Sequence, residues 1–480
     1  MVFRAGNPGG VQVSPRTMFA VLAGKAAGVA TRSLGKGGGT SLPGLIATRI
    51  QPPLVKELAA QLEAGAIVVS GTNGKTTTSR MLASILTGAE FTVLRNASGS
   101  NLTRGVASAL VARVNVWGTI RGDVPTLGLF EVDEAALPEV VEMVQPSKLL
   151  LNNLFRDQLD RYGEVATVAR LWSSAISRLP PSAIVIANAD DPLVAEVAAG
   201  SSGNPLYFGI SSVPDKGAVG EHASDVKSCP RCGGPIAYSL VTLGHLGHYR
   251  CTYCEFARPE PVVCAENVRL RGIDGSDFTL CFGDETVSVR LPLPGLYNVY
   301  NALAAAAAAS ALGVDLSEVG VALGHVTAAF GRMERLDVDG HIVYLALAKN
   351  PAGFNEVMRT ILQSSERANL LVLLNDNTAD GHDVSWIWDA DVEMLAGHVA
   401  QATFSGTRAP DMALRFKYAE VVDGRAGESH IESNTGAALA RALAGLNTED
   451  VLFVVPTYTA MLDVRGVLTR LGHVKPYWEE

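Results

Sequence analysis

The sequence predicts an α/β protein in which a parallel sheet carries a phosphate-binding loop and an inserted four-cysteine ribbon, followed by a smaller α/β domain. Three observations support this prediction. Apolar strand-like runs alternate with helix-like runs, a glycine-bracketed loop joins one strand to one helix, and two C-x-x-C pairs interrupt the pattern. At 480 residues the chain is too long for one ordinary core, so more than one domain is expected.

The composition is that of a folded protein whose main partner is not nucleic acid. Hydrophobic residues make up 48% of the chain and charged residues 18%, as in globular domains. The formal net charge of −9 gives no general basic footprint for DNA or RNA. No apolar run reaches the length of a transmembrane helix. The run Met18–Lys25 resembles a signal-peptide core, but Lys25 interrupts it and no cleavage site follows, so we expect a cytoplasmic protein.

Residues 1–55 are expected to form a peripheral N-terminal element. They combine an apolar helix candidate with a glycine-rich stretch at residues 35–39, and such a segment packs on a larger body or forms a mobile arm. A solvated basic arm is favoured over contact with an anionic surface. The basic residues of this element include Arg4, Arg16, Lys25, Arg32 and Lys36.

A phosphate-binding loop is predicted where the apolar strand Ala66–Val69 meets the following helix. Gly71 and Gly74 allow the backbone to curl so that its N–H groups point at an anion. The helix contributes its dipole, Lys75 can reach the terminal phosphates, and the Thr76 hydroxyl can bind Mg²⁺. The candidate nucleotide-binding residues are Gly71, Thr72, Asn73, Gly74, Lys75, Thr76 and Thr77, and Lys75 is also a catalytic candidate.

The loop departs from the common G-x-x-x-x-G-K-[ST] spacing, because Val69 stands where the first glycine is expected. A glycine-rich turn without a ligand is the alternative interpretation. The Lys75-Thr76 pair between a strand and a helix favours nucleotide binding. We therefore expect the protein to bind ATP and Mg²⁺.

The remaining alternation divides the chain into domains. Residues 56–333 are expected to hold a parallel sheet covered by helices, and residues 334–480 a smaller C-terminal α/β domain. The alanine-rich run from Asn301 to Ala311 is expected to be a buried helix. The expected strands are Ala66–Val69, Thr126–Val132, Leu149–Leu151 and Ala183–Ile186 in the central domain, and Ile342–Leu345, Leu370–Leu374 and Val451–Val455 in the C-terminal domain.

Acidic residues close the strand expected at residues 126–132. Carboxylates at the C-terminal edge of a parallel strand, beside a phosphate loop, can hold the Mg²⁺ of a nucleotide. Glu131 and Glu134 are both candidates, and the pattern does not separate them. Acidic residues also favour the first turn of a helix, but the nearby phosphate loop favours metal binding.

Two C-x-x-C pairs predict a zinc ribbon inserted at residues 222–264. The spacing C-x₂-C-x₁₈-C-x₂-C is typical of four-thiolate zinc sites. Four thiolates close the coordination shell, so the zinc is expected to be structural; a redox pair or unrelated thiols are the alternatives. His245 and His248 are expected at the surface, and Cys264 and Cys281 as buried thiols. The predicted zinc ligands are Cys229, Cys232, Cys251 and Cys254.

Six motifs in register, from about residue 65 to about residue 335, resemble the Mur ligase family, whose members form amide bonds with ATP in peptidoglycan synthesis. The resemblance implies that Asn301 and Asn298 contact the adenine and that Arg332 contacts a phosphate. Besides the phosphate loop and the strand-end glutamate, the motifs lie at residues 152–163, 188–192, 293–301 and 331–334.

The chain departs from this family at three positions. Gln158 stands where the family has a metal-binding histidine, Tyr297 replaces a second histidine, and Lys349 replaces the histidine of the motif that opens the C-terminal domain. The first 55 residues leave no room for the usual UDP-sugar-binding domain. The resemblance therefore implies a substrate other than a soluble UDP-linked precursor.

Within this family, a core with a ribbon in its central domain resembles the branch that amidates lipid II. The resemblance implies ATP-dependent conversion of the D-isoglutamate α-carboxylate in the lipid II stem peptide to D-isoglutamine, through an acyl phosphate. Ammonia would come from a GatD-like class I glutaminase in a heterodimer, at the inner face of the cytoplasmic membrane. The segments Leu374–Asp389 and Pro456–Leu462 extend this resemblance to nearly the whole chain.

The same resemblance implies that an aspartate of this chain completes the catalytic triad of the glutaminase, by holding the partner's histidine in its working tautomer. Asp383 is favoured by its position in the motif, and Asp380 is the second choice. The alternative is that these aspartates only cap the helix expected at Trp386–Trp388.

Two other functions are considered. One is a folylpolyglutamate-type or Mur-type ligase that adds an amino acid, against which the ribbon and the Asp-Gly-His-Asp segment argue. The other is a non-catalytic activator of a glutaminase, which the departures at Gln158 and Lys349 would permit. ATP turnover that depends on lipid II distinguishes an enzyme from such an activator.

Overall fold

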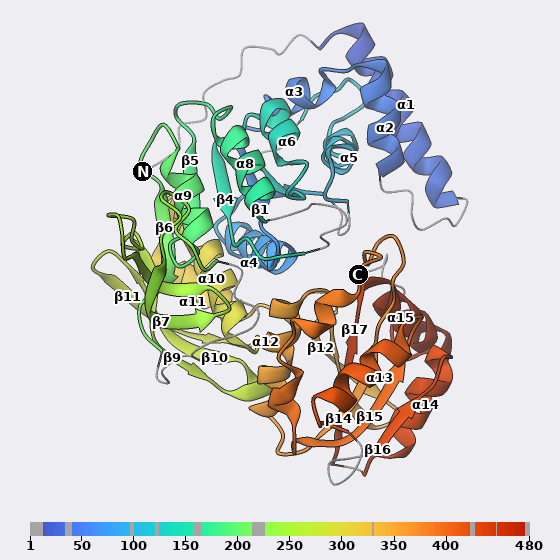
Figure 1. The fold of residues 1–480 in the computed structure, drawn as a ribbon. Helices are drawn as coiled ribbons and strands as arrows, with labels where there is room; N and C mark the ends of the chain where they lie inside the picture. The colour runs from blue at the N-terminus through green and yellow to red at the C-terminus, as the bar shows by residue number, and fades with distance from the viewer. Residues whose placement is uncertain are drawn as a thin grey trace.

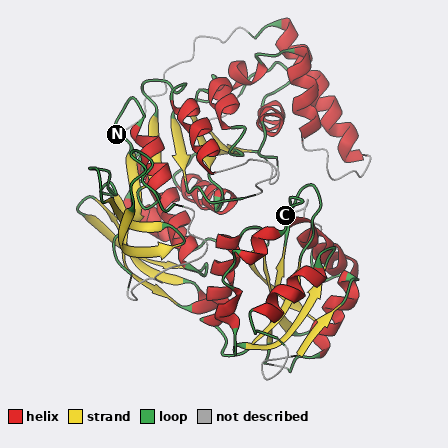
Figure 2. Cartoon of the chain, viewed as in Figure 1, coloured by secondary structure: helices red, strands yellow, loops and turns green. Residues whose placement is uncertain are grey.

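The computed structural model consists of a central α/β domain that carries an N-terminal helical element, and a C-terminal α/β domain (Figures 1 and 2). The predictions for Arg4, Lys36, Gln158 and the glycine-rich stretch lie outside the described residues, as does the beginning of the 222–264 insert. The structure describes residues 13–33, 41–96, 100–120, 124–157, 165–213, 226–328, 331–422, 428–447 and 449–475.

The central domain is built on a nine-stranded sheet in the order β11-β10-β9-β6-β5-β4-β1-β3-β2. Strands β1 to β6 and β9 run parallel, and β10 and β11 extend the sheet as antiparallel strands. The C-terminal ends of β1, β3 and β4 therefore meet at one edge, where the phosphate loop begins. The strands are β1 Ala66–Ser70, β2 Thr92–Arg95, β3 Thr126–Glu131, β4 Lys148–Leu151, β5 Ile184–Asn188, β6 Leu206–Ile210, β9 Val263–Leu270, β10 Ser276–Phe282 and β11 Glu285–Leu291.

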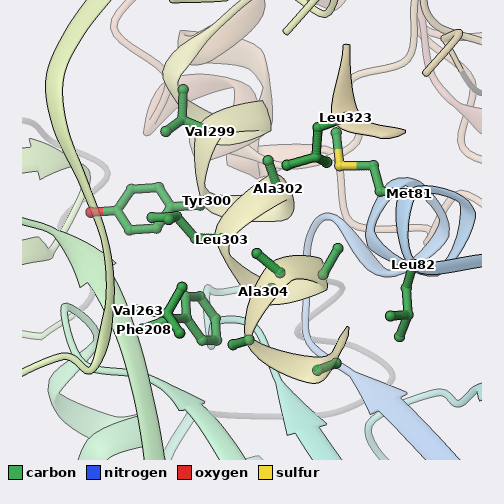
Figure 3. Packing of buried hydrophobic residues seen from close by; sticks show 14 of the residues in the cluster. Met81, Leu82, Phe208, Val263, Val299, Tyr300, Ala302, Leu303, Ala304 and Leu323 are labelled. Carbon is green, nitrogen blue, oxygen red and sulfur yellow. The ribbon is translucent and has the colours of Figure 1, made fainter. Parts of the chain in front are cut away.

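Helices cover both faces of this sheet: α4, α10 and α11 pack on one face, and α3, α5, α6, α8 and α9 on the other. The predicted alanine-rich helix is confirmed as α10, which begins earlier than expected, at Leu296. Figure 3 shows its Ala302 and Ala304 packed among Met81 of α4 and Phe208 of β6. Small side chains let this helix lie close to the sheet. The helices are α3 Leu54–Ala59, α4 Lys75–Gly88, α5 Thr103–Arg113, α6 Leu137–Val144, α8 Val165–Ile176, α9 Pro192–Ala199, α10 Leu296–Ser310 and α11 Leu316–Leu323.

The N-terminal element packs on the central domain through α1 (Pro15–Ser33) and α2 (Leu42–Ile50). The contact of α2 with α5 is close, because a Cβ added at Gly44 would lie 2.2 Å from the carbonyl oxygen of Arg104. The two helices thereby extend the core on the α5 side of the sheet. Their residues buried in this core include Ala20, Val21 and Ala47.

The inserted segment forms an antiparallel hairpin of β7 (Ile236–Leu243) and β8 (Leu246–Cys251). It lies in the sequence between β6 and β9, which are nevertheless direct parallel neighbours in the main sheet. The insertion therefore leaves the nine-stranded sheet continuous.

The C-terminal domain has a six-stranded sheet in the order β12-β13-β17-β14-β15-β16, parallel except for β12. Helices α12 and α13 pack on one face, and α14 and α15 on the other. All the strands predicted from sequence in both domains are present, with small shifts at their ends. The elements are β12 Arg332–Val338, β13 His341–Ala346, α12 Pro351–Leu362, β14 Ala368–Leu373, β15 Val399–Ser405, α13 Ala409–Tyr418, β16 Glu428–Ile431, α14 Thr435–Ala444, β17 Val451–Pro456 and α15 Tyr458–Leu471.

Candidate active site between the two domains

The loop after β1 has the backbone geometry of a phosphate cradle. Gly74 adopts φ +84°, and a Cβ added there would lie 2.0 Å from Oδ1 of Asn301, so glycine is required. Helix α4 starts directly afterwards at Lys75, and the first N–H groups of a helix have no partner within it. The loop and helix together can therefore bind an anion.

Lys75 is held at this loop by a buried carboxylate. Its Nζ lies 2.9 Å from Oε2 of Glu134, and the two side chains are only 9% and 8% exposed. It also donates to the carbonyl oxygen of Gly71. Burial lowers the pKa of Lys75, but the charge and hydrogen bond of Glu134, together with the charges of Glu131 and Asp133, outweigh it, so the pKa is raised above its usual value. Lys75 therefore stays charged at neutral pH.

Thr76 contacts the other glutamate that the sequence could not separate from Glu134. Its Oγ1 donates to Oε1 of Glu131 at 2.9 Å, and Glu131 is the last residue of β3. A hydroxyl and a carboxylate oxygen on neighbouring elements, beside a phosphate cradle, fit the oxygen ligands that Mg²⁺ prefers.

A set of asparagines fixes the loop against its neighbours, and sequence reasoning had assigned no role to most of them. The backbone N–H of Asn73 donates to Oδ1 of Asn153 at 2.9 Å. Nδ2 of Asn152 donates to Oγ1 of Thr78 at 3.1 Å, and Thr78 donates to Oδ1 of Asn301 at 3.2 Å. Asn152 and Asn153 directly follow β4, the parallel neighbour of β1, and this position is the signal in the sequence that could have found them.

A cleft of about 700 Å³ opens in front of the loop, between the central and C-terminal domains. Polar and apolar side chains both line it, as they do in small-molecule sites. Asn298 does not line it, since its amide donates to the carbonyl oxygen of Pro294 at 2.8 Å and accepts from Asn301 at 3.0 Å. Asn298 thus orients the side chain of Asn301 from outside the cleft. The predicted residues that do line the cleft are Asn73, Gly74, Thr77, Asn301 and Arg332.

Arg332 reaches the cleft from the first residue of β12. Burial lowers the pKa of its guanidinium, and the charge of Glu131 opposes this shift. An arginine starts from so high a pKa that it remains charged. Arg332 and Lys75 therefore supply two positive charges to this region, one from each domain.

The tip of the inserted hairpin forms part of the apolar wall of the cleft. Leu243 and Leu246, at the ends of β7 and β8, line it together with Phe155 and Tyr297. Burial raises the pKa of Tyr297, so its ring is neutral. No local pattern in the sequence indicates that the ribbon contributes to this cleft, because the contact depends on how the hairpin folds back onto the sheet.

The expectation that His245 lies at the surface is wrong. It occupies the turn of the hairpin and is buried, because the turn packs against the central domain. Its ring centroid lies 4.6 Å from that of Phe155, and its Nε2 lies 3.4 Å from Oδ2 of Asp191. His248 is half-buried, with Nε2 2.8 Å from the carbonyl oxygen of Ile210.

The two aspartates of the 188–192 motif support the fold beside the cleft. Asp191 caps α9 by accepting from the backbone N–H of Val194. Oδ1 of Asp190 accepts from Nε of Arg258 at 2.6 Å, and Oδ2 from the hydroxyl of Tyr300 at 2.6 Å. Since Tyr300 lines the cleft, Asp190 positions a cleft residue without lining the cleft itself.

A second cleft, of about 440 Å³, lies beside the residues that precede α12. Both Asp380 and Asp383 line it. Asp383 is exposed, and its Oδ1 accepts from the backbone N–H of Ser385 at 2.8 Å; hydrogen bonding by Ser385 lowers its pKa. Asp380 is buried and accepts from the backbone N–H of Thr459 at 2.8 Å. Burial raises the pKa of Asp380 although Thr459 opposes the shift.

Contacts between the domains separate and support the two clefts. Lys349, one of the departures from the family pattern, forms an ion pair with Asp157 of the central domain. Nδ2 of Asn350 donates to Oδ1 of Asn73 in the phosphate loop at 3.1 Å. Because Lys349 and Asn350 directly precede α12, whose first turn lines the larger cleft, the start of α12 belongs to both clefts.

The four predicted zinc ligands lie together. Their Sγ atoms are all within 4.8 Å of one another, with 3.7 Å between Cys229 and Cys254 and 3.5 Å between Cys232 and Cys251. Tetrahedral zinc with Zn–S bonds of about 2.3 Å places its sulfurs about 3.8 Å apart. The donor set and its spacing therefore fit zinc.

No helix among the described residues has the length and apolar character needed to cross a membrane. The two family models that match cover residues 69–229, as the Mur ligase middle domain, and residues 347–461, as the MurT ligase C-terminal domain.

Comparison with known proteins gives relatives over nearly the full length. A Streptococcus pneumoniae protein named as subunit MurT of the glutamine-hydrolyzing lipid II isoglutaminyl synthase is 33% identical, over 94% of this chain and 97% of its own. A Staphylococcus aureus protein of the same name is 32% identical, over 85% and 89% respectively.

Solved structures agree on the fold. A pseudomurein peptide ligase from Methanothermus fervidus superposes with a TM-score of 0.64 at 23% identity, covering 86% of this chain and 80% of its own. MurF from Acinetobacter baumannii superposes with a TM-score of 0.62 at 19% identity, covering 88% and 80%. These structures support the predicted α/β fold class. The chain belongs to the family of the MurT subunits of lipid II isoglutaminyl synthase, within the Mur ligases.

Proposed function

We propose that this chain is the ATP-dependent ligase subunit that amidates the α-carboxylate of D-isoglutamate in the stem peptide of lipid II, with ammonia supplied by a glutaminase subunit. The names of its full-length relatives support the substrate and the amide donor. The observation that carries the proposal is the pair of clefts at the start of α12: one holds the phosphate loop, and the other holds the exposed carboxylate of Asp383.

The reaction needs an activated carboxylate, because an unactivated one is a poor electrophile. An oxygen of the substrate carboxylate attacks the γ-phosphorus of ATP, the bond from that phosphorus to the bridging oxygen breaks, and ADP leaves. Ammonia then attacks the acyl carbon, the acyl–oxygen bond breaks, phosphate leaves, and the nitrogen loses a proton. Phosphoryl transfer of this kind depends on positioning and on positive charge around the moving group.

The residues of the larger cleft suit these needs. Lys75 and Arg332 would stabilise the charge on the transferred phosphoryl group, and the loop N–H groups would hold the phosphates. Thr76 and Glu131 would hold Mg²⁺, which neutralises phosphate oxygens when bound. Asn301 would face the nucleoside, with Asn298 fixing its amide. Glu134 would act indirectly, by holding Lys75.

Asp383 is the better candidate for the carboxylate that completes the partner's triad. It is exposed, and hydrogen bonding by Ser385 lowers its pKa, so its carboxylate is charged and accessible to a partner. Asp380 is buried and bonded to Thr459 within the C-terminal domain, so a partner's histidine would have to displace those contacts. The N-cap of the short helix Ser385–Trp388 is Val384 and not Asp383, so the bond from Ser385 to Asp383 is a local turn contact.

The direct test combines the purified chain and its glutaminase partner with lipid II, ATP and Mg²⁺. ATP consumption and amidated lipid II are expected in equal amounts, with either glutamine or ammonium as nitrogen source, and Lys75→Ala is expected to lose at least a hundredfold in rate. Addition of an amino acid in place of ammonia would identify an amino-acid ligase. Glutaminase stimulation without any ATP consumption would identify a non-catalytic activator.

The role of Asp383 is tested by comparing glutamine with free ammonium as the nitrogen source for amidation. Asp383→Asn is expected to abolish glutamine-driven amidation and to retain amidation with free ammonium. Asp315→Asn, an exposed aspartate before α11 that makes no capping bond, is the matched control and should change neither. Equal loss of both activities in Asp383→Asn would contradict the assignment.

A further inference from the structure

Helix α1 is anchored by one face only. Thr17, Ala20 and Val21 are buried in the central domain, and Oγ1 of Thr17 donates to Oε2 of Glu57 at 2.6 Å. A Cβ added at Gly24 would lie 2.9 Å from the carbonyl oxygen of Pro43, so α1 and α2 cross closely. The helix is therefore fixed in place, at the outer edge of the molecule (Figure 1).

The opposite face of α1 is also apolar, and its side chains are exposed. Phe19 is 63% exposed, Leu22 47% and Val29 56%, and Ala26 between them is exposed as well. Positions 19, 22, 26 and 29 lie on one side of a helix. A helix that is apolar on both sides is normally covered on both. The solvated arm expected from the sequence does not account for this stripe.

Further apolar side chains lie beside the N-terminal end of α1. The loop after α5 exposes Val116 by 48% and Trp117 by 64%. The loop touches the start of the helix, since a Cβ added at Gly118 would lie 2.9 Å from Cγ1 of Val13. Tryptophan is enriched where proteins meet the boundary between lipid and water.

Charge separates this part of the chain from the rest. Every charged residue in the first 56 positions is basic, although the whole chain has a net charge of −9. Arg16, Lys25 and Arg49 lie on α1 and α2, and the first acidic residue is Glu57. An apolar stripe on a helix that carries basic and no acidic residues complements a bilayer of anionic lipids. The negative charge of the remainder would disfavour docking through other faces.

We propose that the outer face of α1, defined by Phe19, Leu22, Ala26 and Val29, docks the enzyme onto an anionic lipid bilayer. The inference rests on the proposed function, in which the substrate is attached to lipid, so the enzyme must work next to a membrane surface. Helix α1 lies in the interface and does not span it. A few apolar side chains and basic groups give weak, reversible attachment, which suits an enzyme that moves between substrate molecules.

The test measures flotation of the full chain with its glutaminase partner on vesicles, without any turnover. Phe19→Ser/Leu22→Ser/Val29→Ser is compared with Val262→Ser/Val321→Ser/Leu471→Ser, whose side chains are 46%, 66% and 61% exposed elsewhere. On vesicles of phosphatidylglycerol and phosphatidylcholine in equal parts, the α1 triple variant is expected to bind at least tenfold more weakly. The control variant is expected to bind like the unmodified protein.

Lipid composition and salt provide the second readout. Binding of the unmodified protein is expected to fall at least tenfold on pure phosphatidylcholine, and to weaken when salt rises from about 50 to about 500 mM, because screening shortens the reach of the basic residues. Equal binding by the two triple variants would overturn the proposal. So would protection of α1 from hydrogen exchange by the glutaminase alone or by self-association, which would identify a protein partner instead.

A kinetic comparison distinguishes failure of this proposal from failure of the proposed function. The α1 triple variant should have a raised KM for lipid II in vesicles and an unchanged rate with a short-chain, water-soluble analogue. If the unmodified protein amidates neither substrate, the proposed function fails. If both substrates are amidated equally well by the variant, the reaction stands and the docking face is refuted.

Discussion

Glu131 and Glu134 differ in what they contact, although they are neighbours in the sequence. Glu131 accepts from the hydroxyl of Thr76, whereas Glu134 pairs with the buried ammonium of Lys75. The difference arises because Glu131 ends β3 while Glu134 lies in the turn that follows. We infer that Glu131 helps to bind Mg²⁺ and that Glu134 holds Lys75 in place.

This division predicts different defects in two isosteric variants. Glu131→Gln is expected to raise the Mg²⁺ concentration needed for half-maximal ATP turnover by about 10- to 100-fold, as is usual when a residue that supports a metal is changed. Glu134→Gln is expected to keep the Mg²⁺ dependence but to cost about 3 kcal/mol of stability, because Lys75 loses its buried counter-charge. Mg²⁺ titrations and urea unfolding measure both, and a shifted Mg²⁺ dependence in Glu134→Gln alone would reverse the assignment.

At the scale of elements, the start of α4 depends on the backbone of a single glycine. Gly74 has a left-handed conformation and its Cα faces the side chain of Asn301. At the other end of the same helix, a Cβ on Gly88 would meet nothing within 4 Å. Gly74, the N-cap of α4, therefore has no room for a side chain, whereas Gly88 at the end of α4 has room for one.

Gly74→Ala is expected to lose about 1–3 kcal/mol of stability together with measurable ATP binding, because the cradle and Asn301 would be displaced. Gly88→Ala is expected to be neutral or to gain up to about 1 kcal/mol, through the lower entropy of the unfolded chain. Thermal unfolding with and without ATP tests both. Retained ATP-dependent stabilisation in Gly74→Ala would contradict this account of the loop.

The ribbon is the second element whose role becomes clear in the structure. Its cysteines hold one end of the β7–β8 hairpin, while Leu243 and Leu246 at the other end line the nucleotide cleft. Because β6 and β9 pair directly, the main sheet does not need the ribbon in order to form. We infer that zinc supports the cleft through the hairpin.

Zinc removal is therefore expected to weaken nucleotide binding without unfolding the protein. Cys232→Ser should lower the zinc content from about one ion per chain and weaken ATP binding about tenfold, equivalent to about 1.4 kcal/mol. Cys281→Ser, whose thiol lies on β10 outside the ribbon, is the control and should retain both. Elemental analysis and calorimetry measure the effect, and full ATP affinity in a zinc-free protein would contradict it.

At the scale of the whole molecule, the two domains meet through polar contacts around the start of α12. The side chains of the Arg156–Asp389 pair are 36% and 45% exposed. Such exposed ion pairs contribute about 0–1 kcal/mol to stability. The pair Lys349–Asp157 is better shielded, at 24% and 6% exposed. The lysine that departs from the family pattern is therefore the stronger link between the domains.

Lys349→Gln is expected to lower kcat/KM for amidation about tenfold, because the C-terminal domain would hold Arg332 and α12 less firmly against the phosphate loop. Arg156→Gln should change kcat/KM less than about twofold, since its pair is more exposed. Small-angle scattering with and without ATP should show a more open average shape only for Lys349→Gln. Equal effects of the two variants would show that the pairs act alike.

Sequence reasoning identified groups whose function depends on neighbours along the chain. The strand Ala66–Ser70, the loop up to Lys75 and the cysteine pairs are recognisable because short-range spacing determines their geometry. Asn153 and Leu243 line the cleft but are not predicted as cleft residues from the sequence. Asn153 is marked in the sequence only by its position after a strand, and Leu243 reaches the cleft because the hairpin folds back onto the sheet, a contact that no local pattern marks.

The sequence by itself determined the alternation that builds two α/β domains, the phosphate loop and the zinc ligand set, because periodicity and local backbone preferences are properties of short segments. Only the tertiary structure decided which glutamate contacts Thr76, that Lys349 pairs with Asp157, that His245 is buried and that the outer face of α1 is exposed. These depend on the register of parallel strands, on the folding of the hairpin onto the sheet and on the docking of two domains. Each brings together residues far apart in the chain.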